Sequence, residues 1–362
     1  MKIEIYSPTI RRKEMDAVLT AMVEDKIGPG ERSRLLIQAA KEHLHFDYAL
    51  ALRSPATALH LALKALNLEA GQGVIVSALS PRYYTHVLAD LRLTPLYCDV
   101  TFGFPCISRE SVEKTLAVKP AGVDARCIVL HHTLGFMPDT ASIAELGLPI
   151  IDDISQSYGI PSGAGTKETA GQKPEPEGAA EAKNRVPGVF SILGLEERDM
   201  LTSGGGALLF AMNRRDGSVL RNYANLPPEY CLPDINAAMA AVQFRETGRN
   251  VERRQEIAGV YTRASLRTKH SRFLPLVEGD YNHYTFALVL ETGLKDVTAY
   301  ARKKEIIVES AFDHTLAGAG ISDPVLCPVS YSLSLRTVLF PLYPRLRSQE
   351  VERVSKLIMT LP

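Results

Sequence analysis

The stretch that decides the fold is PIIDDISQSYG, which runs from Pro149 to Gly159. It begins with a short apolar run of the length of a buried strand, and the run ends in the carboxylates of Asp152 and Asp153. In sheets of parallel strands, ligands bind beyond the carboxyl ends of the strands. The stretch therefore predicts a buried strand that presents an acidic side chain to a ligand site.

Other short apolar runs lie on both sides of this stretch in the sequence. They are Val74–Val76, Leu96–Val100, Cys127–Leu130 and Ala207–Phe210. Helical patterns stand between them, as in Thr57–Leu68, where the apolar residues recur at helical spacing. Strands that alternate with helices predict an α/β fold with a mainly parallel sheet covered by helices on both faces.

The last third of the chain predicts a second, smaller α+β domain. A long helical pattern runs from Asp234 to about Arg263, and we expect the boundary between a large domain, residues 1–250, and a small domain, residues 251–362, to fall within it. The small domain is expected to hold a strand at Tyr284–Leu290 and helices at Val297–Lys304 and Ser348–Leu357. Residues 162–183 contain no large apolar side chain, so this segment is predicted to be a flexible excursion.

Composition excludes several classes of function. The 362 residues carry 41 basic and 41 acidic side chains, so no overall field would attract nucleic acid or an anionic membrane. No stretch has the uncharged length of a membrane span. The five cysteines are scattered and never spaced as CxxC, which favours a reducing cytoplasm and argues against a disulfide framework or a metal site.

Taken together, six segments resemble one family across nearly the whole chain. They are Ile27–Gly30, Ala58–Leu63, Gly71–Val100, His132–Gly135 as His-x-x-Gly, Asp153–Gly159 as Asp-x-x-Gln-x-x-Gly, and Phe340–Leu346. In order and spacing they resemble the DegT/DnrJ/StrS sugar aminotransferases, which depend on pyridoxal phosphate (PLP). The resemblance implies the fold-type-I architecture of that family.

The resemblance also implies roles for three residues that are present. Asp153 would pair with the protonated pyridine nitrogen and keep the cofactor an electron sink. Gln156 would reach the phenolic oxygen of the ring, and Ser191 would donate to the phosphate. Taken alone, a carboxylate at the end of a strand is often a helix cap or an ion-pair partner, and Asp152 would serve that purpose as well.

One residue that the family chemistry requires is missing. The lysine that forms the aldimine with PLP aligns with Arg198, and no lysine occurs between Lys183 and Lys269. Arginine does not replace it, because the guanidinium stays protonated and is not a nucleophile at neutral pH. Lys183 lies in the expected excursion and would have to fold back into the pocket.

Other positions around the same ligand also depart from the family. The Gly-Thr turn that holds the phosphate reads Pro55-Ala56, with Thr57 adjacent, so an N–H donor and a hydroxyl are lost. The aromatic residue that stacks on the pyridine ring aligns with Pro81, and Tyr83 or Tyr84 would replace it only after a local shift.

The family's asparagine that one subunit offers to the phosphate of its partner aligns with Glu229, a carboxylate that would repel a phosphate. His86 is a further candidate for the pocket lining. These departures predict a pocket that no longer holds PLP.

Three interpretations follow. The first is a non-catalytic or repurposed homodimer, with a pocket at the subunit interface, no bound cofactor, and another small molecule as ligand or none. The second is a keto-sugar dehydratase that uses the amine form of the cofactor (PMP), with His86 or His132 as the base. The third is an ordinary aminotransferase, acting on a nucleotide-linked keto sugar, in which Lys183 or another lysine reaches the pocket.

Overall fold

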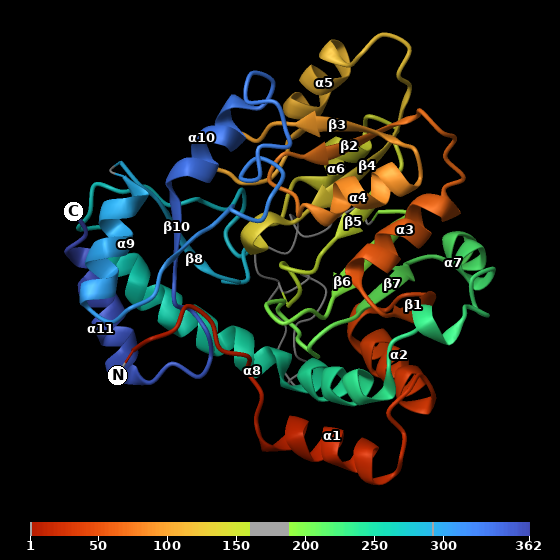
Figure 1. The fold of residues 1–362 in the computed structure, drawn as a ribbon, viewed down its shortest axis with the longest axis horizontal. Coiled ribbons are helices and arrows are strands. Elements are labelled where there is room, and N and C mark those ends of the chain that lie inside the picture. Colours follow the sequence, from red (N-terminus) through yellow and green to blue (C-terminus); the bar gives the residue numbers. More distant parts are fainter. Residues whose placement is uncertain (1, 160–187, 292) are drawn as a thin grey trace, which may run out of the picture.

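A computed structural model describes residues 2–159, 188–291 and 293–362 (Figure 1). The expected excursion at residues 162–183, and Lys183 with it, lies outside the described residues.

The described residues form one large sheet of seven strands in the order β1-β7-β6-β5-β4-β2-β3. The strands are β1 Tyr48–Leu52, β2 Gly73–Ser77, β3 Thr94–Cys98, β4 Ala125–His131, β5 Ile150–Asp153, β6 Phe190–Gly194 and β7 Ala207–Ala211. From β6 to β3 every pairing is parallel, whereas β7 is antiparallel to both of its neighbours. The prediction of a mainly parallel sheet is confirmed.

Helices cover both faces of this sheet, as the buried strands require. The first face carries α3 Pro55–Ala65, α4 Tyr83–Asp90 and α7 Arg214–Arg221, and the second face carries α2 Glu31–Leu44, α5 Arg109–Val118, α6 Thr140–Ala144 and part of α8 Asp234–Ser265. Outside this second layer, α1 Arg12–Val23 packs along α8. Because side chains alternate along a strand, Val129 and Ile151 pack on the first face and Ile128 and Ile150 on the second.

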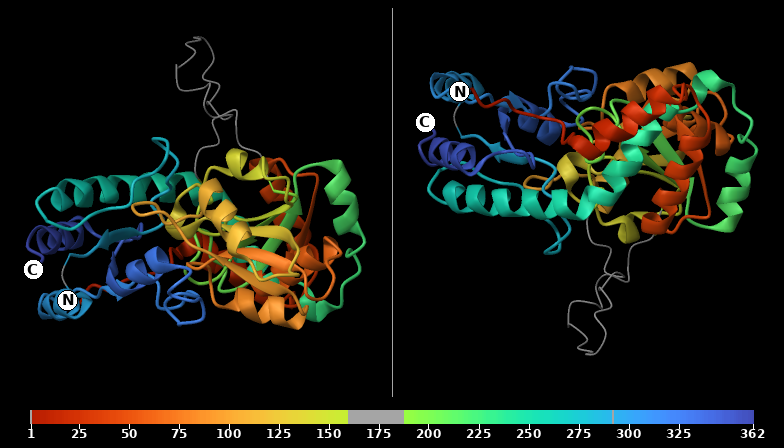
Figure 2. Two further views of the ribbon diagram at one scale, coloured as in Figure 1. Left: turned by 90° about the horizontal axis from the view of Figure 1, so that it is seen from above. Right: turned by 90° about the horizontal axis from the view of Figure 1, so that it is seen from below.

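A second, antiparallel sheet in the order β8-β10-β9 forms from the last third of the chain. Its strands are β8 Phe286–Val289, β9 Glu309–Ser310 and β10 Thr337–Phe340, and its helices are α9 Leu294–Lys303, α10 Pro328–Arg336 and α11 Ser348–Met359. Figure 2 shows that this unit lies beside the large sheet and that the single helix α8 runs through both parts. The expected boundary near residue 250 thus falls inside an unbroken helix.

The N-terminal residues belong to the smaller unit in space. Ile3 bridges Ile306 in parallel and lies in the same apolar core as Ile257, Phe286 and Phe340. Ile3 therefore packs in the smaller unit, although the sequence pattern groups it with the large domain.

Three simple features of the described part bear on function. Its five cysteines are all free thiols. Nowhere in it do three His, Cys, Asp or Glu side chains gather as a metal would require. None of the helices described is both long enough and apolar enough to cross a bilayer.

Candidate functional site

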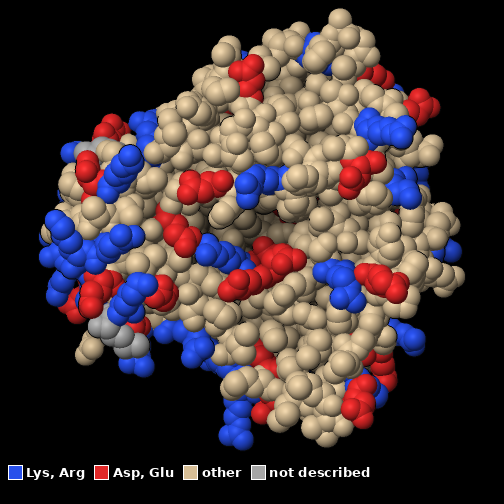
Figure 3. All heavy atoms as spheres, viewed as in Figure 1, with Lys and Arg blue, Asp and Glu red and all other residues tan. Residues whose placement is uncertain are grey.

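A cleft of about 520 Å³ lies between the carboxyl ends of the large sheet and the smaller sheet. Figure 3 shows the molecule hollowed between its two parts, with acidic and basic side chains around the hollow. The lining residues from the large sheet include Pro81, His131, Thr133, Gln156 and Arg198, and those from the smaller unit include Tyr284, Glu309 and His314. None of the residues described in this lining is a lysine.

Asp153 lies at the end of β5, outside the residues that line the cleft, and is 1% exposed. Its Oδ2 accepts a hydrogen bond from the hydroxyl of Tyr84 at 2.6 Å, and the hydroxyl of Tyr83 lies 3.4 Å from the same oxygen. Its Oδ1 accepts from the backbone N–H of Ser155 at 3.1 Å and from the Ser155 hydroxyl. The carboxylate is therefore fully engaged by side chains and backbone of its own chain.

The pKa of Asp153 follows from this environment. Burial alone would raise the pKa, but His131, Ser155 and Tyr84 more than offset burial and lower it to about 2. Asp153 is thus a carboxylate at any physiological pH. Burial, and after it the nearby Asp153 and Tyr83, hold the pKa of Tyr84 well above its usual value. The tyrosine therefore remains a hydrogen-bond donor.

His131 links Asp153 to the cleft. Its Nδ1 lies 3.6 Å from Asp153 Oδ2, and this buried nitrogen has no hydrogen-bond partner among the described residues. His131 also lines the cleft, so the ring stands between the buried carboxylate and the space that a ligand would occupy.

A second carboxyl group, Asp199, lies close to the first. Its Oδ2 accepts from the backbone N–H of Glu196 at 2.9 Å, and a Cβ on Gly194 would touch both Asp199 Oδ2 and Ser155 Oγ. Burial, with a contribution from the charge of Asp153, raises the pKa of Asp199 to about 8. One acid of the pair is therefore ionised at pH 7 while the other holds its proton.

Arg198 lies at the rim of the cleft rather than in its floor. Its guanidinium donates to both carboxylate oxygens of Glu309, at 2.7 and 3.3 Å, and its side chain is 52% exposed. Because Glu309 belongs to β9, this bidentate pair connects the large sheet to the smaller one across the cleft.

The N-terminus of α3 lies at the edge of the first face of the sheet. Ser54 caps the helix, since its Oγ accepts from the backbone N–H of Thr57 at 3.1 Å and also contacts the Thr57 hydroxyl at 2.9 Å. Pro55 has no N–H, and the N–H of Ala58 bonds to the carbonyl of Ser54. Of the first N–H groups of this helix, only that of Ala56 is left for an anion.

A sequence profile of the DegT/DnrJ/EryC1/StrS aminotransferase family matches residues 8–171 and 212–359. The chain belongs to this family. The resemblance inferred from the motifs is confirmed, and the unmatched stretch in between contains β6 and Arg198, so the prediction that Arg198 stands at the lysine position stays a prediction.

Individual relatives agree with the profile. The dTDP-4-dehydro-2,3,6-trideoxy-D-glucose 4-aminotransferase of Saccharopolyspora spinosa is 26% identical over 392 residues, which cover 98% of this chain and 95% of that enzyme. The L-glutamine:2-deoxy-scyllo-inosose aminotransferase of Streptomyces fradiae is 27% identical over 227 residues, or 61% of this chain, and the match spans 47% of that relative's length.

The fold is also that of known aminotransferase structures. The crystal structure of the aminotransferase TlmJ from Streptoalloteichus hindustanus superposes with a TM-score of 0.82 at 19% identity, covering 99% of this chain and 98% of the other. The expected fold-type-I architecture is thereby confirmed.

The structure brings some of the residues singled out from the family motifs together and separates others. Gln156 lines the cleft, but its Oε1 already accepts from the backbone N–H of Leu134 at 2.7 Å. Ser191 on β6 pairs in register with Asp152 on β5. Because side chains alternate along a strand, the Ser191 side chain lies on the opposite face of the sheet from that of Asp153. The three residues expected around one DegT-type cofactor therefore do not converge on one point.

Two other family-derived candidates lie away from this cleft. His86 is exposed on α4, and Glu229 is exposed on the short 3-10 helix Pro228–Tyr230; neither lines the cleft of its own chain. The role of Glu229 toward a partner subunit stays a prediction.

Sequence reasoning missed His131, Asp199, Tyr284 and Glu309. Asp199 directly follows the lysine position and His131 directly precedes the family's turn histidine, so proximity to the motifs was the available signal. Glu309 and Tyr284 come from the smaller unit, and no motif marks them.

Proposed function

We propose that this member of the DegT/DnrJ/EryC1/StrS family has lost PLP-dependent transamination and binds a different small molecule in the cleft, as a homodimer in the cytoplasm. The observation that carries the proposal is the hydrogen bond of 2.6 Å from Tyr84 to Asp153. In the family, by resemblance, this carboxylate pairs with the pyridine nitrogen. Here a fully buried phenol of the same chain holds it.

The lysine position supports the same conclusion. Arg198 has no free amine for an aldimine, and its guanidinium is directed to Glu309 on the smaller sheet. The described lining offers no lysine in its place. Proton transfer at the substrate carbon, which the lysine amine performs in such enzymes, therefore lacks its usual residue.

The phosphate end supports it as well. A PLP phosphate is held chiefly by backbone N–H groups and hydroxyls at a helix N-terminus. At α3, Pro55 has removed one N–H, and the Ser54 cap takes the N–H of Thr57 and contacts its hydroxyl. The residues present therefore do not fit the cofactor at the ring, at the lysine or at the phosphate.

A dehydratase that uses the amine form of the cofactor is less well supported than a protein that no longer binds the cofactor. His131 and His314 line the cleft, but neither of the two histidines that the sequence offers as the base of such an enzyme presents a free ring nitrogen there. His132 bonds through Nδ1 to Ser157 at 2.6 Å and through Nε2 to Asp152 at 2.7 Å, so both nitrogens are engaged. His86 is exposed on α4 and lies outside the lining.

The homodimer is proposed from family membership and from α1. Met15, Leu19 and Met22 recur at helical spacing on this helix and are each more than half exposed, while Ala21 packs inward. An exposed apolar stripe of this kind is typical of a protein–protein interface. Sedimentation velocity would measure the mass directly, and Leu19→Glu is expected to shift a dimer toward monomer.

The loss of transamination is tested by incubating the purified protein with excess PLP, removing the free cofactor, and recording the visible spectrum before and after borohydride. We expect no retained absorption band. An active aminotransferase of the family, treated in parallel, is the positive control. A stoichiometric adduct that mass spectrometry maps to one lysine, Lys183 included, would overturn the proposal and restore the aminotransferase interpretation.

A further inference from the structure

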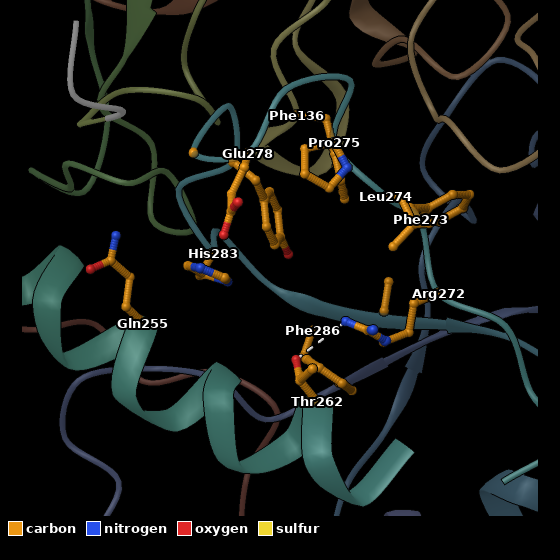
Figure 4. Close-up of a pocket in the computed structure, with 13 residues that line it drawn as sticks. Phe136, Gln255, Thr262, Arg272, Phe273, Leu274, Pro275, Glu278, His283 and Phe286 are labelled. Atoms are coloured by element: carbon orange, nitrogen blue, oxygen red, sulfur yellow. Dashed lines mark hydrogen bonds between the residues drawn. The ribbon is translucent and has the colours of Figure 1, made fainter. Parts of the chain in front are cut away.

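A second pocket, of about 360 Å³, lies apart from the cleft (Figure 4). It is enclosed by Gln255 and Thr262 of α8, by the segment 272–283, by Phe286 and Ala287 of β8, and by Phe136 from the large-sheet part. This pocket shares no lining residue with the cleft. Its volume is that of a small-molecule site.

The pocket has a preformed aromatic wall. The rings of Phe136 and Tyr281 stack at 4.1 Å between centroids with an interplanar angle of 16°, and His283 meets Tyr281 edge-on at 4.6 Å. Backbone bonds fix this wall, since the N–H of Met137 donates to the carbonyl of Asp280 at 3.1 Å and Phe136 bridges Tyr281. A planar ring therefore meets a surface that does not have to be ordered first.

The charges of the pocket are not compensated by the protein. Arg272 is half-buried and donates to the Thr262 hydroxyl at 3.3 Å, and no described carboxylate lies within ion-pair distance of it. Glu278 is exposed on the segment 272–283 and likewise has no ion pair in the described part. In Figure 4 the two side chains lie apart, with Arg272 beside Thr262 and Glu278 on the other side of the pocket.

The third ionisable group is neutral. Burial, with a further contribution from the charge of Arg254, lowers the pKa of His283 to about 4, so the ring carries no charge at pH 7. His283 also adopts a positive φ of 56°, an uncommon conformation for a residue other than glycine. The pocket thus offers one guanidinium, one carboxylate and an uncharged aromatic surface.

We propose that this pocket binds a small aromatic monocarboxylate with a hydrogen-bond donor at the far end of its ring. The carboxylate takes the guanidinium of Arg272, whose fork of N–H groups matches a carboxylate. The ring packs on Tyr281 and His283, and the buried Phe136 stacks on Tyr281 and supports it. The donor at the opposite end reaches Glu278, which also disfavours a second negative charge on the ligand.

The probe for this proposal is 4-hydroxybenzoate, titrated by calorimetry into the full-length protein at pH 7. We expect saturable binding that Arg272→Gln weakens at least about tenfold, because the charged hydrogen bonds are lost. Tyr281→Leu should weaken it severalfold. Arg267→Gln, which changes an exposed arginine near the end of α8 outside the pocket, should leave it unchanged.

Two further measurements keep the result decisive. The neutral analogue 4-hydroxybenzyl alcohol should bind at least about tenfold more weakly than the carboxylate. If Arg272→Gln does not fold, Thr262→Val removes the hydroxyl that holds the guanidinium and should weaken binding about threefold.

The proposal is overturned by the absence of saturable binding at millimolar 4-hydroxybenzoate, or by equal affinity for the neutral analogue. It is also overturned if Arg198→Gln, a change at the rim of the cleft, weakens binding while Arg272→Gln does not, because the ligand would then occupy the cleft. The proposed loss of transamination is unaffected by any of these outcomes.

Discussion

The two ends of the site marked by the family motifs differ in what their own chain does with the binding groups. At the ring end, the carboxylate of Asp153 accepts hydrogen bonds from Tyr84 and Ser155. At the phosphate end, Pro55 has no N–H, and the Thr57 N–H donates to the Ser54 cap. The comparison indicates that a retained motif residue is weak support for retained function when its partners come from the same chain.

The two ends should also differ in how much they contribute to the stability of the protein. The ring end is buried and polar, so its hydrogen bonds must be satisfied for the protein to be stable. The phosphate end is a helix N-terminus that a single serine cap satisfies. Changes at the ring end should therefore cost much more stability than changes at the phosphate end.

The largest effect is expected for Asp153→Ala. It leaves the buried donors of Tyr84 and Ser155 without an acceptor, and breaking such a network should lower the free energy of unfolding by about 4 kcal/mol. Urea denaturation monitored by circular dichroism measures this loss. Asp313→Ala, which removes an exposed carboxylate near the same cleft, is the matched control and should change stability by less than about 0.5 kcal/mol.

The second prediction concerns pH at the ring end. The folded-state pKa of Asp199, about 8, is raised above its unfolded value, so its contribution to stability is full below about pH 4 and is lost as pH rises through 8. Asp199→Asn cannot ionise and should therefore gain on the order of 3 kcal/mol relative to wild type between pH 4 and pH 9. Denaturation midpoints at these two pH values provide the test, and a pH-independent difference would contradict it.

The contribution of Asp153 to stability depends on pH in the opposite direction. Its folded-state pKa, about 2, is below the unfolded value, so its contribution is present above about pH 4 and is lost as pH falls through 2. The acid limb of the stability curve should thus belong to Asp153 and the decline between about pH 4 and pH 8 to Asp199. At the phosphate end, Ser54, Pro55 and Ala56 carry no titratable side chain, so changes there should leave both limbs unchanged.

Whether a feature of the fold or the site can be predicted from the sequence depends on how far apart in the chain the interacting residues lie. The strand that ends at Asp153, the parallel sheet and the loss of an N–H at Pro55 follow from local sequence, because apolar runs and proline act locally. The sequence predicts that Tyr83 or Tyr84 replaces the ring-stacking aromatic only after a local shift, and the structure directs both hydroxyls to the carboxylate. That outcome depends on the packing of α4 against β5, which no single-sequence pattern encodes.

The ion pair at the rim of the cleft could not be predicted from the sequence for the same reason. The motif order predicts Arg198 at the lysine position, but it does not predict its partner Glu309, which lies more than a hundred residues away on the smaller sheet. Ser191 was assigned to the phosphate by motif order alone, and its position on the far face of β6 follows from strand register. Long-range pairing and register are therefore what the sequence leaves open.

The third prediction isolates one bond at the ring end. Tyr84→Phe keeps the buried ring but removes the hydroxyl that donates to Asp153, so stability should fall by about 2 kcal/mol, as for other hydrogen bonds to charged groups. Tyr331→Phe, at a tyrosine that is 41% exposed, is the control and should be nearly neutral. Since Phe fills the same volume, PLP should still not bind. Retention of PLP by this variant would mean that the hydroxyl alone had closed the ring site.

The smallest effect is expected at the phosphate end. Ser54→Ala removes the cap of α3 and should cost about 1 kcal/mol, the usual value for an N-cap serine. Ser108→Ala, which removes the equivalent cap of α5 far from the cleft, should cost about the same. Inorganic phosphate should not stabilise the wild type, because its α3 terminus has one N–H left to offer. If phosphate raises the unfolding midpoint of wild type, this end of the site still binds an anion, and only the ring end has been closed.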